Sequence, residues 1–133
     1  MSESHMRGRV LQLLRHLDAM AVENPARPGT ADVNYIEGWI ELKQLRRWPR
    51  SPSDIVPCGH FRPGQRVWIR RRARKGGRVH VLLQVHADWL LLPGGWAADN
   101  LGHTTRLQLE DAAVGVWQGR LNGKEFVKCL LES

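Results

Sequence analysis

The spacing of hydrophobic and polar residues predicts the order helix, hairpin, helix, hairpin and helices along the chain. Apolar residues recur at helical spacing up to Ala21, which predicts an amphipathic helix over Arg7–Ala21. Two prolines and a glycine in ENPARPGT end that helix. The short runs DVNYI and WIELK then predict two strands joined through Glu37-Gly38, a dipeptide suited to a hairpin turn.

The second half of the chain repeats this alternation of helix and hairpin. A polar, proline-broken loop over residues 46–61 has a length typical of functional loops. Pro63 starts a second helix, which stops at Gly76-Gly77. RVHVLLQV and WLLL predict a second hairpin, and we expect helices over residues 104–117 and 122–132, the latter with a capping box at its start. The pattern therefore predicts an α/β layer with a mixed sheet.

Composition adds an expectation about the partner. The 133 residues suit one domain, and 20 Lys and Arg against 13 acids give a net charge of +7, most of the excess lying between Arg46 and Arg78. Such a field attracts a polyanion, either nucleic acid or an anionic membrane. No apolar run is long enough to span a bilayer, no signal-peptide pattern is present, and two cysteines form no disulfide framework. We therefore expect a cytoplasmic protein.

Three ionisable residues in the first hairpin form a candidate site. In WIELK, alternation turns Glu41 and Lys43 to one face of the strand, while Ile40 and Leu42 face the core. Asp32, in the preceding strand, can be placed by the register of the hairpin. The alternative to a functional site is a charged strand that is simply exposed to solvent.

Two hairpin registers remain open. A two-residue loop at Glu37-Gly38 places Asp32 opposite Lys43, whereas a loop at Ile36-Glu37 places it opposite Glu41. Both registers bring the three groups to one face of the sheet. A one-residue bulge would instead turn Asp32 to the other face.

Two adjacent carboxylates and a lysine suit metal-dependent hydrolysis. Carboxylates only a few ångströms apart repel each other unless a cation lies between them. Mg²⁺ is typically held by one or two carboxylates, with water and substrate phosphate filling the remaining positions. The lysine can orient a water molecule or stabilise charge building on phosphorus. These are the groups that phosphodiester hydrolysis needs.

TADVNYIEGWIELK resembles the central motif of the PD-(D/E)xK nuclease superfamily, in particular small phage-type endonucleases and Holliday-junction resolvases. Asp32 matches the motif aspartate, and Glu41-Leu42-Lys43 matches the ExK. HFRPGQRVWIRRR is similar to the following helix, where Gln65 matches a glutamine near the site. The resemblance spans roughly residues 10 to 95. Ala31 departs from the pattern, because it replaces the usual proline before the aspartate.

The resemblance implies a restriction-endonuclease-like core, a mixed β-sheet flanked by helices, and a Mg²⁺-dependent DNA endonuclease in which Mn²⁺ can substitute. Asp32, Glu41 and the Leu42 carbonyl would bind the metal, Lys43 would position water, and Gln65 would support the site. A further acid, Glu23 or alternatively Asp18, is left open. The family also implies a homodimer and, if the chain is phage-encoded, action in the host cytoplasm.

The same reading divides the chain into three parts. Residues 1–6, MSESHM, are expected to be a disordered start or the remnant of a tag, residues 7–95 the nuclease core, and residues 96–133 a helical extension of the same domain. Six arginines are expected to contact the DNA backbone: Arg46, Arg47, Arg50, Arg66, Arg70 and Arg74.

The substrate and the activity itself have open alternatives. The DNA can be a four-way junction of recombination, a nicked or replicating duplex, or a specific site. The rival functions are a noncatalytic basic module that binds nucleic acid and a phage assembly protein that packs against DNA.

Overall fold

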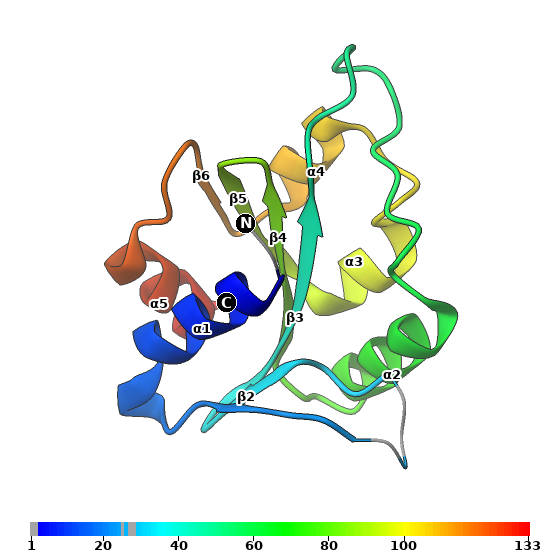
Figure 1. Cartoon of the computed structure of the whole chain (residues 1–133). Helices are drawn as coiled ribbons and strands as arrows, with labels where there is room; N and C mark the ends of the chain where they lie inside the picture. Colours follow the sequence, from blue (N-terminus) through cyan, green and yellow to red (C-terminus); the bar gives the residue numbers. More distant parts are fainter. Residues whose placement is uncertain (1–2, 25, 27–28) are drawn as a thin grey trace.

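The computed structural model describes residues 3–24, 26 and 29–133, which form a six-stranded mixed sheet with helices on both faces (Figure 1). In chain order the elements are α1 (Glu3–Leu13), the short 3-10 helix η1 (Arg15–Leu17), β1 (Met20–Ala21), β2 (Val33–Tyr35), β3 (Gly38–Leu45), α2 (Pro63–Arg74), β4 (Val79–Val85), β5 (Asp88–Pro93), α3 (Gly94–Asn100), α4 (Arg106–Ala112), β6 (Gly115–Trp117) and α5 (Gly123–Glu132). The expected α/β class with a mixed sheet is confirmed.

The strands lie in the sheet in the same order as in the chain. β1, β2 and β3 are antiparallel neighbours, and so are β4, β5 and β6. The central pair, β3 and β4, is parallel. A parallel pair needs a crossover connection, and residues 46–78 provide it with α2 over one face of the sheet.

Each face of the sheet has its own hydrophobic core. On one face Ile40, Leu42 and Leu82 pack with residues of α1 and α5. On the other face Val81 and Leu83 pack with residues of α2, α3 and α4. All seven residues of β4 are buried, because helices cover both of its faces (Figure 1). Glu41 and Lys43 therefore lie on the face that α2 covers, since they alternate with Ile40 and Leu42.

The N-terminal helix differs from the prediction at both ends. It begins at Glu3, inside the segment that we expected to be disordered, because Met6 is completely buried in the core. It ends at Leu13 rather than at Ala21. Asp18 then adopts a left-handed conformation, and Met20–Ala21 pairs with β2 as an edge strand. Residues 1–2 lie outside the described residues.

The C-terminal third is less helical than predicted. The expected helix over 104–117 is divided into α4 and the strand β6, which pairs with β5. Pairing with β5 turns Trp117 onto the ring of Phe126 at 6.3 Å between centroids, a contact that no helical periodicity could reveal. α3 was not predicted. α2, β4 and β5 are confirmed, and Asn122 caps α5 by accepting a hydrogen bond from the Glu125 N–H.

Within residues 3–24, 26 and 29–133, no helix is long and apolar enough to cross a membrane.

Candidate metal and catalytic site

The hairpin of β2 and β3 adopts the second of the two predicted registers. Val33 lies opposite Ile40 and Tyr35 lies opposite Gly38, which leaves Ile36 and Glu37 as the two-residue loop. Asp32 precedes Val33, so the register continues to Asp32 opposite Glu41. No bulge intervenes, and the expected gathering of Asp32, Glu41 and Lys43 on one face is therefore present.

Asp32 is held in this place by backbone contacts. Its Oδ2 accepts a hydrogen bond from the Leu42 N–H at 2.8 Å, and its own carbonyl accepts one from the Val22 N–H at 2.9 Å. The side chain thus replaces a backbone acceptor just beyond the start of β2. In a strand, the N–H and the C=O of one residue point to the same side, so the Leu42 carbonyl is directed toward Asp32.

Glu41 is the least solvated acid of the site. Its exposure is 0%, and that of Lys43 is 3%. Lys43 Nζ lies 3.0 Å from Glu41 Oε2 as an ion pair. Apart from this ion pair, neither Glu41 oxygen has a hydrogen bond of regular geometry among the described residues.

The surroundings of Glu41 change its acidity. Burial raises the pKa of the carboxyl, the negative charge of Asp32 also raises it and Lys43 lowers it, and the net result is a pKa of about 8. The net effect is that Glu41 ionises much less readily than an exposed glutamate. Ionisation of a buried acid beside a second acid is unfavourable. A cation bound next to both acids would make it favourable.

Lys43 is enclosed by residues of the loop after β3. Its Nζ lies 5.5 Å from the centre of the Phe61 ring, which also carries the Arg66 guanidinium at 4.3 Å. Sequence reasoning missed Phe61, because nothing in a long polar loop indicates which residue folds back over the sheet. Asp32 is only partly buried, so solvent reaches the site from its side.

Gln65, the supporting residue that the resemblance implies, has a structural role in the first turn of α2. Gln65 lies in the first turn of α2, where its Oε1 accepts a hydrogen bond from the Arg62 N–H at 2.9 Å. Gly29 brings the segment before Asp32 against this turn, because a Cβ on Gly29 would lie 2.6 Å from the Gly64 carbonyl oxygen. Gln65 is therefore near the site but acts as a helix cap.

The acids proposed to complete the metal set are not gathered with the other two. Glu23 and Asp18 are both exposed. No group of three or more His, Cys, Asp or Glu side chains in the described part of the chain is arranged to hold a metal ion. The candidate site therefore has two carboxylates, Asp32 and Glu41, and one backbone carbonyl.

The six expected DNA contacts divide into two groups. Arg46, Arg47 and Arg50 follow β3 and are exposed, as is Arg74 on α2. Arg66 instead donates hydrogen bonds to three backbone carbonyls, those of Phe61, Ala98 and Leu101.

Arg70 is also committed to the protein. Its Nε donates a hydrogen bond to Asp99 Oδ1 at 2.7 Å, and its NH2 donates one to the Ala98 carbonyl. Arg66 and Arg70 therefore fasten α2 to α3, a use that charge alone could not predict.

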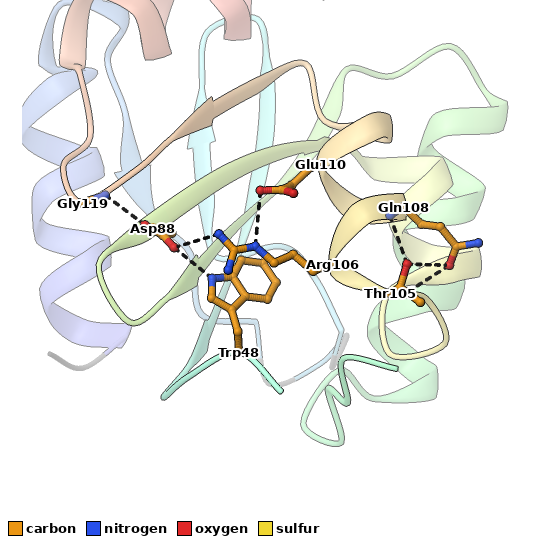
Figure 2. Close-up of polar contacts among 7 residues, drawn as sticks. All are labelled: Trp48, Asp88, Thr105, Arg106, Gln108, Glu110 and Gly119. Atoms are coloured by element: carbon orange, nitrogen blue, oxygen red, sulfur yellow. Dashed lines mark hydrogen bonds and ion pairs between the residues drawn. The ribbon is translucent and has the colours of Figure 1, made fainter. Parts of the chain in front are cut away.

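Trp48 is held by the network around Asp88 (Figure 2). Its Nε1 donates a hydrogen bond to Asp88 Oδ2 at 2.9 Å, and the Arg106 guanidinium lies 4.4 Å from the centre of its ring. Asp88 Oδ1 accepts a second hydrogen bond, from the Gly119 N–H at 3.0 Å. The network ties the loop after β3 to β5, α4 and the segment before α5. Trp48 therefore packs within the protein.

No protein-family model matches the chain, and no curated protein matches it either.

Proposed function

We propose that the chain is a Mg²⁺-dependent DNA endonuclease with a PD-(D/E)xK site on a restriction-endonuclease-like core. The observation that carries the proposal is Glu41, a fully buried carboxyl whose two oxygens lack hydrogen-bond partners among the described residues, beside Asp32 and Lys43. Buried polar groups are nearly always satisfied, so such an exception needs an explanation. A divalent cation bound between the two acids provides one.

Each residue of the candidate site has a proposed role that follows from its chemistry. Asp32, Glu41 and the Leu42 carbonyl offer hard oxygen ligands of the kind that Mg²⁺ prefers. When bound, the ion supplies positive charge that offsets charge on a phosphate and lowers the pKa of water. Lys43, whose Nζ lies 3.0 Å from Glu41 Oε2, is placed to donate a hydrogen bond to a water molecule or a phosphate oxygen.

The order of the strands supports the core architecture. An antiparallel meander of β1, β2 and β3 is followed by the α2 crossover to the parallel strand β4. Asp32 directly precedes β2, and Glu41 lies within β3. Arg46, Arg47 and Arg50 extend from the end of β3, where a DNA strand entering from the Asp32 side could contact them.

One observation favours a second candidate, a basic module that binds nucleic acid without cutting it. Glu41 and Lys43 are closed off from solvent, so a phosphodiester reaches them only through the Asp32 side. In that case their ion pair would serve the fold alone.

Cleavage assays separate the two candidates. Plasmid and branched DNA are incubated with Mg²⁺ or Mn²⁺ and with the wild type, Asp32→Asn, Lys43→Met or the matched control Asp111→Asn, an exposed acid on α4. We expect the wild type and the control to nick or cut, and both site variants to lose activity by about 10²-fold or more. Folding of each variant is checked by its thermal unfolding. If the wild type binds DNA but cuts no substrate with either metal, the enzyme proposal is wrong.

A further inference from the structure

The C-terminal half of α2 borders a hollow with a distinct chemistry. A pocket of about 460 Å³ is lined by Trp68, Arg71, Arg72, Lys75 and the Gly76-Gly77 turn. A second hollow of about 310 Å³ shares Arg71 and Lys75 with it and adds Arg74. The two hollows make one basic surface around the end of the helix.

This surface carries more cations than are required to offset the negative end of the helix dipole. The C-terminus of a helix carries roughly half a unit of negative charge, which one nearby cation offsets. Arg71, Arg74 and Lys75 are all exposed, and in the described part of the chain none of them has an acidic partner. Arg71 and Lys75 are also four residues apart, a spacing at which like charges destabilise a helix. An anionic ligand would remove this repulsion.

An aromatic wall stands beside the cations. Trp68 meets Trp39 edge to face at 5.1 Å between ring centroids, and the Arg72 guanidinium covers both rings, at 4.7 Å from Trp68 and 5.3 Å from Trp39. These contacts fix the orientation of Trp68 while it still lines the pocket. Cations beside an indole of fixed orientation are suited to bind a strand that carries both phosphates and bases.

The pocket lies further along α2, on the same side of the sheet as the candidate site. One stripe of α2 begins at Gln65, near the segment that precedes Asp32, passes through Trp68 and reaches Arg72. Trp39 belongs to the same face of β3 as Glu41, so the pocket and the acid pair share one side of the sheet.

We propose that this pocket is a DNA-strand subsite, in which Arg71 and Lys75 bind a backbone phosphate and Trp68 contacts the neighbouring sugar or base. The subsite lies on the same side of the sheet as the acid pair. The inference rests on the proposed function in taking DNA as the ligand, but it concerns binding and is tested without metal.

The test measures fluorescence anisotropy of a labelled single-stranded oligonucleotide of about 12 nucleotides, with EDTA present and at several salt concentrations. Arg71→Ala/Lys75→Ala is compared with Lys124→Ala/Lys128→Ala, which removes the same charge from the exposed side of α5 on the opposite face of the sheet. We expect the first pair to weaken binding about tenfold or more and to reduce the salt slope by about 0.7, the value for one phosphate of a single strand. The control pair should change binding less than about twofold.

A second readout addresses Trp68. Saturating oligonucleotide should quench part of the indole fluorescence of the wild type, and Trp68→Phe should lose that part while it retains the packing on Trp39. Equal weakening by the two double variants, or quenching unchanged in Trp68→Phe, would overturn the subsite.

The outcomes for the subsite and for the enzyme can be told apart. If the α2 variants lose oligonucleotide binding while the wild type cuts no DNA, the subsite stands and the nuclease proposal fails. If the wild type cuts DNA and Arg71→Ala/Lys75→Ala binds the oligonucleotide as tightly as it does, the subsite fails and the nuclease proposal stands.

Discussion

The backbone N–H of Leu42 donates a hydrogen bond to Oδ2 of Asp32 at 2.8 Å, so the aspartate is fixed to the strand that carries Glu41 and Lys43. This bond does not require the charge of Asp32, because a neutral amide oxygen can also accept it. Orientation and charge can therefore be tested separately at this position.

Asp32→Asn is expected to retain the fold and lose the metal. Without Mg²⁺ its melting temperature should equal or exceed that of the wild type, since the repulsion between Asp32 and Glu41 is removed. Saturating Mg²⁺ should raise the melting temperature of the wild type by several degrees and leave that of the variant unchanged. Thermal unfolding with EDTA or Mg²⁺ measures both effects. Asp111→Asn is the control, and a full Mg²⁺ response in Asp32→Asn would contradict the site.

Glu41 is expected to make the metal-free protein less stable as the pH rises. Its pKa is raised from 4.5 to about 8 by folding, so between these values the folded state holds a proton that the unfolded chain has lost. The free energy of unfolding should fall through this window, by about 1.36 kcal/mol per pKa unit at most.

Glu41→Gln should remove this dependence. Urea unfolding of both proteins in EDTA, from about pH 5 to about pH 9, should show the variant gaining stability relative to the wild type as the pH rises. Parallel curves would show that Glu41 titrates normally. Mg²⁺ competes with the proton on Glu41, so the affinity of the wild type for Mg²⁺ should increase up to about pH 8.

His80 is expected to destabilise the protein in acid. It is buried in β4 beside Ser133, and burial lowers its pKa from 6.5 to about 4, with Arg78 adding to the effect. Between pH 6.5 and about 4, His80 therefore binds a proton in the unfolded chain but not in the folded protein. Stability should fall as the pH drops through this range, by about 3 kcal/mol in total. His80→Gln should flatten the acid limb of the urea-unfolding profile, whereas exposed His103→Gln should leave it steep.

Asp88 is expected to contribute more as an acceptor than as a charge. Asp88→Ala leaves the Trp48 and Gly119 N–H groups without their acceptor, which should cost about 2–3 kcal/mol of unfolding free energy. Asp88→Asn retains one of the two acceptor oxygens, so it keeps one of these hydrogen bonds and loses the other together with the 3.5 Å ion pair to Arg106; its cost should be smaller, about 1–2 kcal/mol. Urea unfolding of the two variants measures the difference. Equal losses would mean that the ion pair dominates.

The gathering of the site could be predicted because alternation is a strict rule in strands. Both registers with a two-residue loop bring Asp32, Glu41 and Lys43 to one face, so the choice between the two turns does not change the prediction. The choice of Ile36-Glu37 as the loop was not predictable, since two neighbouring dipeptides suited a turn. The burial of Glu41 was also hidden, because it depends on α2 and on the segment around Phe61.

The elements that the sequence missed are those defined by tertiary contacts. β6 consists of three residues that resemble the end of a helix, and only pairing with β5 makes them a strand. Met6 looked like part of a tag, although it fills the core beneath the sheet. The sequence indicated that Arg66 and Arg70 are surface cations. In the structure Arg66 donates hydrogen bonds to backbone carbonyls and Arg70 forms an ion pair with Asp99.

The parallel pairing of β3 with β4 has a consequence for how the protein folds. The β2–β3 hairpin is local and can form early, whereas Glu41 meets its neighbour Val81 only after the entire crossover over residues 46–78 has closed. Until that step Glu41 lies on an open hairpin in water, without the burial that raises its pKa. The unusual chemistry of the site is therefore acquired late in folding, and a chain cut within the crossover would keep the motif but lose its environment.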